Sequence, residues 1–238
     1  MEDNHGIEYD GYYKYDAHVA SNYNNDRQNE EHWIKENNFV LQYFKKHSVD
    51  SLLDLPVGTG RFFDFYENII KITGIDISDA MLLEAEKKIE DLNYAEKIKL
   101  EKGDVFNLNY QDAFFDCTIV FRLFHLIPEE KLDAAIQELC RVTKKHIIVQ
   151  TYEIMKPTLL ERLRNKLLRE IKKVLQLNNL KTIKIEKKET PWSHISAYFY
   201  KEGLISSIFV KNGYSISHRE ILCPYELVKV IVTIFTKN

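Results

Sequence analysis

Two glycines and an aspartate stand where an apolar stretch ends, in the segment Asp54-Leu-Pro-Val-Gly-Thr-Gly60. Glycine permits a positive φ and lets a ligand touch the main chain, so Gly58 and Gly60 predict a turn that holds a cofactor. Phosphate-binding loops place a lysine after the last glycine, whereas this chain has Arg61. Dinucleotide sites need a third glycine where this chain has Phe63. These two ligand classes are therefore disfavoured.

Further aspartates follow the next apolar stretches of the chain. Asp76 ends the stretch that follows the glycine turn, and Asp104 comes directly after Gly103. An aspartate at the end of a strand can accept hydrogen bonds from both hydroxyls of a ribose. Asp76 is thus a candidate to bind a ribose, while the alternative for a single aspartate at a strand end, a helix cap or a solvated turn residue, stays open.

In this order the segments resemble the motifs of class I S-adenosylmethionine-dependent methyltransferases. The first motif of that family, acid-x-G-x-G-x-G, is matched by Asp54, Gly58 and Gly60, with Pro56 at the place of the first glycine. The resemblance covers about residues 52–152. It implies the cofactor S-adenosylmethionine, the product S-adenosylhomocysteine and a Rossmann-like sheet of seven strands.

The resemblance also assigns roles to individual residues. Asp104 would accept a hydrogen bond from the adenine amino group, and the backbone near Val105 would read the ring edge. Tyr15 would close the pocket and Arg27 would pair with the cofactor carboxylate through a bidentate fork. The full set of expected cofactor-binding residues is Tyr15, Arg27, Asp54, Pro56, Gly58, Gly60, Asp76, Ile77, Asp104, Val105 and Phe121.

A general base is needed only when the methyl acceptor is protonated. His125, just after the fourth expected strand, and His194, in the segment Pro-Trp-Ser-His, are the candidates. A single histidine is more often structural, so both alternatives stay open. The three cysteines, Cys117, Cys140 and Cys223, form no C-x-x-C pair, so we expect no metal site and a reducing cytoplasm.

The elements that must position these residues follow a β-α rhythm from about residue 51 onward. Strands are expected at 51–55, 72–77, 98–102, 117–121, 146–151, 214–221 and 228–235. Helices are expected at 30–46, 61–70, 79–92, 128–143 and 200–211. The link between the last two strands is too short for a crossover helix, so they must be antiparallel. The fold class is α/β, a doubly wound and mostly parallel seven-stranded sheet with an antiparallel last strand, an N-terminal helical segment and a helical insertion.

One domain is expected for residues 1–238. Within it, residues 1–48 form a helical cover, 49–152 the cofactor-binding core, 153–200 an insertion or lid, and 201–238 a helix and a strand pair. No apolar run approaches the length of a membrane span. The stretch 157–175 reads as a basic amphipathic helix, with three open interpretations: a lid, a membrane-surface contact, or a patch for an acidic or nucleic-acid substrate.

The net charge of −3 argues against a protein built around a polyanion, so nucleic acid is disfavoured as a partner. The first hypothesis is a methyltransferase that acts on O or N of a small-molecule acceptor. Two alternatives stay open: a protein that binds the cofactor without methylating, and an RNA, protein or lipid methyltransferase. The acceptor and the oligomeric state are not specified by the sequence.

Overall fold

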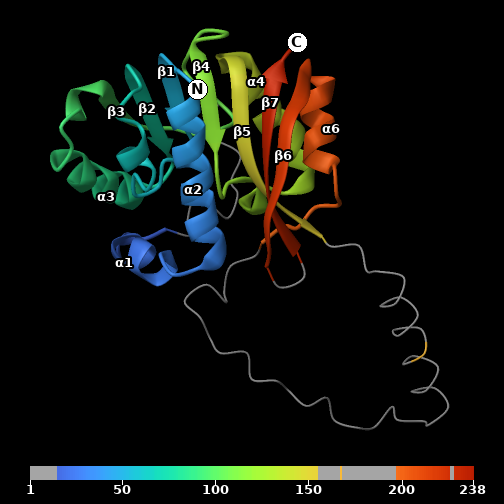
Figure 1. Cartoon of the computed structure of the whole chain (residues 1–238), viewed down its shortest axis with the longest axis horizontal. Helices are drawn as coiled ribbons and strands as arrows, with labels where there is room; N and C mark the ends of the chain where they lie inside the picture. Colours follow the sequence, from blue (N-terminus) through green and yellow to red (C-terminus); the bar gives the residue numbers. More distant parts are fainter. Residues whose placement is uncertain (1–14, 155–166, 168–196, 226–227) are drawn as a thin grey trace, which may run out of the picture. The chain divides into compact units, whose positions relative to one another are not determined.

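A seven-stranded mixed sheet with helices on both faces forms the core of the protein (Figure 1). The computed structural model describes residues 15–154, 167, 197–225 and 228–238. The strands are β1 (Ser51–Asp54), β2 (Lys71–Asp76), β3 (Ile98–Lys102), β4 (Phe115–Val120), β5 (Thr143–Ile154), β6 (Tyr214–Tyr225) and β7 (Val228–Lys237). The α-helices are α1 (Ala17–Arg27), α2 (Glu31–Lys46), α3 (Asp79–Glu90), α4 (Leu132–Val142) and α6 (Leu204–Lys211).

The strands lie in the order β3-β2-β1-β4-β5-β7-β6. Neighbours from β3 to β5 pair in parallel, whereas β7 runs antiparallel between β5 and β6. The predicted fold class is therefore confirmed, including the antiparallel pair at the end of the chain. The chain order reverses between β1 and β4. Open α/β sheets bind their ligands at such a point, beyond the carboxyl ends of the strands.

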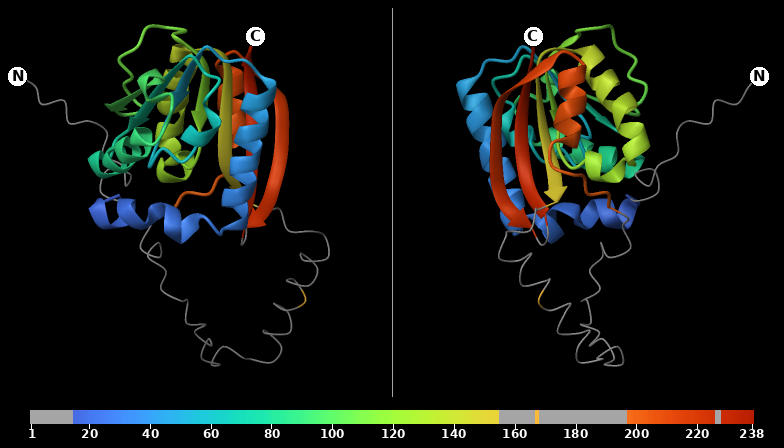
Figure 2. Two further views of the ribbon diagram at one scale, coloured as in Figure 1. Left: turned by 60° about the vertical axis from the view of Figure 1, so that its left-hand side comes forward. Right: turned by 90° about the vertical axis from the view of Figure 1, so that its right-hand side faces the viewer.

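Two apolar clusters fill the space between the sheet and its helices. One cluster joins α2 and α3 to one face of the sheet, and the other joins α4 and α6 to the opposite face (Figure 2). Neighbouring residues of β4 enter different clusters, because Ile119 packs on the side of α2 and Val120 on the side of α4. A strand buried on both faces reads as a continuous apolar run, which explains why the central strands were recognisable from the sequence.

The helix predicted for residues 61–70 is wrong. Only a short 3₁₀ helix, Phe63–Phe65, forms there, and its flanks are successive turns in which a backbone N–H donates to the carbonyl three residues earlier. These turns bury Phe63, Tyr66 and Ile69 in one apolar cluster. Aromatic side chains lose rotamer freedom in an α-helix, so burying them in turns competes well with helix formation. The glycine turn is therefore not followed by the N-terminus of an α-helix.

Other predicted helices are present with shifted boundaries. The helix expected at 128–143 begins at Leu132, after a 3₁₀ helix, Glu129–Lys131, and the helix expected at 200–211 begins at Leu204, after Gly203. Ser78 is the N-cap of α3, because its hydroxyl accepts a hydrogen bond from the Met81 amide at 3.3 Å.

The large apolar side chains of α2 are only partly buried in the core. Trp33, Val40 and Tyr43 are buried, but Ile34 is 49% exposed and Phe39 is partly buried. Ile34 therefore belongs to the outer face of the helix. None of the helices in the described part of the chain is long and apolar enough to cross a membrane. The stretch 157–175 lies outside the described residues, apart from Leu167.

Candidate functional site

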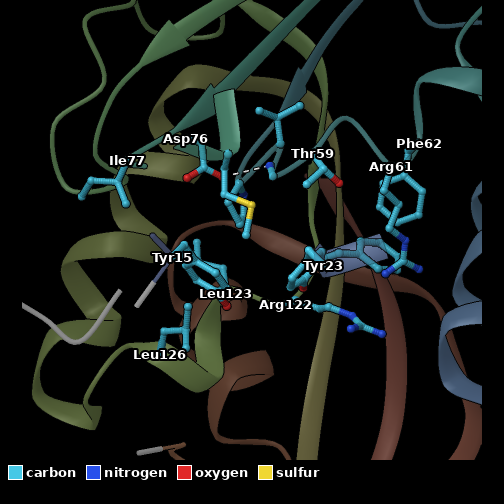
Figure 3. Close-up of a pocket in the computed structure, with 15 residues that line it drawn as sticks. Tyr15, Tyr23, Thr59, Arg61, Phe62, Asp76, Ile77, Arg122, Leu123 and Leu126 are labelled. Atoms are coloured by element: carbon cyan, nitrogen blue, oxygen red, sulfur yellow. Dashed lines mark hydrogen bonds between the residues drawn. The ribbon is translucent and has the colours of Figure 1, made fainter. Parts of the chain in front are cut away.

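A narrow cavity of about 70 Å³ opens beyond the carboxyl ends of β1, β2 and β4 (Figure 3). Figure 3 shows Asp76 and Thr59 on the side of the strands, with Tyr15 and Leu126 across from them. The lining residues come from the N-terminal segment, the glycine turn and the ends of β2 and β4. They are Tyr15, Tyr23, Pro56, Val57, Gly58, Thr59, Arg61, Phe62, Asp76, Ile77, Met81, Phe121, Arg122, Leu123 and Leu126.

Asp76 is a buried carboxylate at the edge of this cavity. One carboxylate oxygen accepts from the Gly58 amide at 2.9 Å, and the other accepts from the Ser78 amide at 2.9 Å. Burial raises the pKa of Asp76 to about 6, although these amides and that of Ile77 counteract the rise. The side chain is therefore held in a fixed orientation by the backbone, with lone pairs left for a ligand.

The two glycines of the turn differ in their surroundings. Both have positive φ, +54° at Gly58 and +70° at Gly60. A Cβ at Gly60 would overlap the ring of Phe63, whereas a Cβ at Gly58 would meet no atom within 4 Å. Because Gly58 lines the cavity, that open space belongs to the site. Gly60 thus allows the turn to pack, and Gly58 allows a ligand to reach the main chain.

Asp54 does not line the cavity. Its buried carboxylate accepts a hydrogen bond from the Tyr66 hydroxyl at 2.8 Å, behind the glycine turn. Burial raises the pKa of Asp54 to about 7, although the bond from Tyr66 counteracts the rise. Asp54 therefore holds the Tyr66 side chain in this structure, and its expected contact with the cofactor stays a prediction.

Replacing Asp54 with asparagine is expected to reduce the loss of folding stability that occurs as the pH rises from 4 to 8. A carboxyl group whose pKa is higher in the folded state stabilises the fold at low pH, and this contribution is lost as the pH rises to about 7. Relative to the parent protein, the free energy of unfolding of Asp54→Asn should gain on the order of 2–4 kcal/mol between pH 4 and pH 8. Urea unfolding across this pH range measures the difference. Equal pH profiles for both proteins would contradict it, and the exposed Asp91→Asn is the control.

Two arginines line the cavity although the sequence motifs did not identify them as site residues. Arg61 and Arg122 both approach the same oxygen of Glu36 in α2, at 2.8 and 3.2 Å. Both guanidinium groups also lie over the indole ring of Trp33, at 3.8 and 4.8 Å from its centroid. Burial opposes ionisation of Glu36, but Arg122 and Arg61 outweigh it and hold its pKa below the usual value. The cluster therefore contains a buried carboxylate and two buried cations.

Tyr15 and Tyr23 of the N-terminal part of the chain line the cavity. The Tyr15 carbonyl accepts from the Ser78 hydroxyl at 2.7 Å, and the Tyr15 ring contacts Tyr23 edge-on. Thr59 of the glycine turn donates to the side chain of Asn24 in α1 at 2.8 Å. Arg27 does not line the cavity, since its guanidinium lies 3.4 Å from Glu30.

The remaining expected site residues divide into two groups. Pro56, Ile77 and Phe121 line the cavity with those already described. Gly60, Asp104, Val105 and His125 do not line it. Asp104 accepts from the Phe106 amide at 3.1 Å, and Val105 is buried. His125 packs edge-on against Tyr152, with ring centroids 5.3 Å apart. His194 lies outside the described residues.

Residues 52–146 match the profile of a family described as "Methyltransferase domain". The chain is 31% identical over 94 residues to phosphatidylethanolamine N-methyltransferase of Cereibacter sphaeroides. The aligned region covers 40% of this chain and 45% of that protein. The chain is also 31% identical over 130 positions to demethylmenaquinone methyltransferase of Lactobacillus johnsonii, covering 52% of each. The chain spans about half the length of these curated relatives.

Solved structures share the fold over nearly the whole chain. A magnesium protoporphyrin IX methyltransferase of Synechocystis, solved with bound S-adenosylhomocysteine, superposes with a TM-score of 0.61. Its sequence identity is 19%, over 88% of this chain and 86% of the other. At this identity the likeness shows the fold alone. The glycine turn and Asp76 lie within the stretch matched by the family profile.

Proposed function

Because the chain belongs to the class I S-adenosylmethionine-dependent methyltransferase family, we propose that it transfers the methyl group of S-adenosylmethionine to an oxygen or nitrogen atom of a small molecule. The observation that carries this proposal is the cavity itself, which brings together Gly58 and the buried Asp76 beyond the ends of β1 and β2. The lack of a clash at Gly58 and the fixed carboxylate of Asp76 both fit an adenosine ligand.

In this proposal Asp76 accepts hydrogen bonds from the ribose hydroxyls, and Ile77 packs beside the adenosine. Asp104 and the Val105 backbone read the adenine, and Tyr15 covers the cofactor. Phe121 packs against its methionine portion, and Arg27 reaches its carboxylate. When bound, S-adenosylmethionine supplies a methyl group on a sulfonium, which is transferred by in-line displacement. The chain's own contribution is then mainly alignment and exclusion of water.

His125 is proposed as the general base for a protonated acceptor. It belongs to a short 3₁₀ helix, Phe124–Leu126, whose last residue lines the cavity. A role in proton transfer predicts that His125→Asn lowers kcat with little change in KM and removes the acidic limb of the pH–rate profile. An unchanged profile would assign His125 to packing against Tyr152.

The direct test is methyl transfer from labelled S-adenosylmethionine to a panel of small acceptors. The panel should include quinols and ethanolamine headgroups, because relatives are named for demethylmenaquinone and phosphatidylethanolamine. Release of S-adenosylhomocysteine with one of these acceptors supports the proposal. Tight cofactor binding with no transfer to oxygen, nitrogen or any macromolecule would instead support a protein that binds the cofactor without methylating.

Cofactor binding is expected to weaken below pH 6. Asp76 has a pKa of about 6, and the protonated carboxyl loses acceptor capacity toward the ribose hydroxyls. The Kd for S-adenosylhomocysteine should therefore stay level from pH 8 to pH 7 and rise about tenfold by pH 5. Calorimetric titration at each pH measures this. The Asp54→Asn protein must show the same profile, and a Kd independent of pH would contradict the role given to Asp76.

Two further expectations from the sequence are kept as proposals. We propose that residues 1–238 form one methyltransferase domain, in which residues 153–200 close over the acceptor. We also propose a cytoplasmic location, which is supported by the three free and buried thiols of Cys117, Cys140 and Cys223. Limited proteolysis with and without S-adenosylhomocysteine tests the first, and cell fractionation tests the second.

A further inference from the structure

The two arginines of the cavity wall lie on the side where an acceptor would approach. Asp76 is at the end of β2, so an adenosine ligand occupies the β2 side of the cavity. Arg122 follows β4, and its backbone amide donates to the Gln150 side chain of β5 at 2.9 Å. Figure 3 shows the guanidinium groups of Arg61 and Arg122 together, away from Asp76. The β4 and β5 side is therefore left for the acceptor.

This cluster has more hydrogen-bond donors than acceptors. Within the part of the chain that the structure describes, the buried atoms Nη1 of Arg61, Nη1 of Arg122 and Nε2 of Gln150 have no hydrogen-bond partner. Among the described residues that contact these arginines, only one buried acceptor atom lacks a partner, and it is Oε1 of Glu36. A buried donor without a partner costs about 1–3 kcal/mol. A ligand that completes the cluster must therefore accept hydrogen bonds.

The charge of the cluster also favours a ligand that accepts hydrogen bonds. Arg61 and Arg122 share one carboxylate oxygen of Glu36, and Arg122 also lies 3.5 Å from Glu30. Glu36 is fully buried, whereas Glu30 is partly exposed and is also 3.1 Å from His32. Two buried cations therefore share one fully buried carboxylate, in a place where burial strengthens electrostatic interactions.

The cofactor adds no net negative charge to this cluster. S-adenosylmethionine carries one carboxylate, one ammonium and one sulfonium, so it adds net positive charge to the cavity. We propose that the methyl acceptor is an anion, whose carboxylate or phosphate group binds Arg122 and Arg61. This inference rests on the proposed function and names the class of its substrate. Guanidinium groups suit it, because they bind both anions in a bidentate manner.

Trp33 gives a direct signal for this site, since both guanidinium groups lie over its ring. The only other tryptophan of the chain is Trp192, which the variant Trp192→Phe removes. This variant, saturated with S-adenosylhomocysteine, is titrated at constant ionic strength with benzoate, phenyl phosphate and the neutral benzamide. The proposal expects saturable changes of Trp33 fluorescence with benzoate or phenyl phosphate and none with benzamide. The anion that binds more tightly shows whether the natural acceptor carries a carboxylate or a phosphate.

Two substitutions with opposite expected effects separate recognition from loss of structure. Arg122→Gln should weaken anion binding at least tenfold. Glu36→Gln leaves both arginines without a charged partner in α2, so it should tighten anion binding about threefold or more. Damage to the fold would weaken binding in both variants. Arg141→Gln is the control, because it removes an arginine of α4 that pairs with Asp112 and Glu138 outside the cavity.

Calorimetric titration of the parent protein with S-adenosylhomocysteine is done first. Failure of that binding would contradict the proposed function itself. Cofactor binding without any response to either anion would overturn only the anionic acceptor. Equal responses to benzoate and benzamide, or weaker binding of anions by Glu36→Gln, would overturn it as well. Loss of S-adenosylhomocysteine binding in Arg122→Gln, with the fold intact by circular dichroism, would assign the arginines to the cofactor carboxylate.

Discussion

Replacement of Asp76 with alanine is expected to weaken binding of S-adenosylhomocysteine by about 100-fold or more. Two hydrogen bonds from the ribose to a charged acceptor are worth roughly 1.5–3 kcal/mol each, and a loss of 1.4 kcal/mol is tenfold in affinity. The effect includes a second contribution, because Asp76 also holds the amides of Gly58 and Ser78. Calorimetric titration measures the affinity, and thermal unfolding reports how much of the loss is structural.

Graded variants separate these two contributions. Asp76→Asn keeps one carbonyl oxygen for a backbone amide but loses the charge, so its affinity should lie between those of the parent and the alanine variant. Asp79→Ala removes an exposed carboxylate three residues further on, which pairs with Lys102 outside the cavity. It should bind the cofactor as the parent does. Undiminished binding by Asp76→Ala would show that the ribose is not held at the end of β2.

Substitution of the two glycines is expected to have contrasting results. Gly60→Ala places a methyl group against the Phe63 ring at a φ of +70°, so it should destabilise the fold by about 2–4 kcal/mol. For a chain of this length that corresponds to a fall in Tm of roughly 5–15 °C. Gly58→Ala meets no clash and should cost only about 1–2 kcal/mol of backbone strain.

For cofactor binding, measured at a temperature where both variants are folded, Gly58→Ala should have the larger effect. The new methyl group of Gly58→Ala lies in the cavity, so it should lower the affinity for S-adenosylhomocysteine at least tenfold. Differential scanning calorimetry and titration of both variants give the two quantities independently. A Gly58→Ala protein with unchanged affinity would mean that the ligand does not approach the glycine turn, and a stable Gly60→Ala would place Phe63 elsewhere.

The parts of the fold that sequence patterns predicted are those with local causes. Central strands such as β1, β2 and β4 are buried on both faces and therefore read as apolar runs, and the short link before β7 fixed its antiparallel direction. The segment after Gly60 was mistaken for a helix because the alternative depends on partners far away. Its aromatic residues bury themselves in a cluster that includes α2 and α3, which local spacing does not reveal.

The same distinction holds for the candidate site. The cavity positions of Asp76, Gly58 and Pro56 follow from a motif of adjacent residues at strand ends. Arg122 was missed because its partner Glu36 is 86 residues away. One signal was available in the sequence: an arginine that follows the largely apolar run Cys117–Phe121 has to bury its charge or point it at a ligand. In the structure Arg122 also takes a positive φ of 59°, which no sequence pattern indicated.

Calorimetric titration of the unmodified protein with S-adenosylhomocysteine is the most direct test of the central claim. The cavity formed by the glycine turn, Asp76 and the N-terminal segment predicts one binding site per chain with a Kd in the micromolar range. An absence of measurable heat with both S-adenosylhomocysteine and S-adenosylmethionine, from protein shown to be folded by circular dichroism, would contradict the claim that this cavity binds the methyl-donating cofactor.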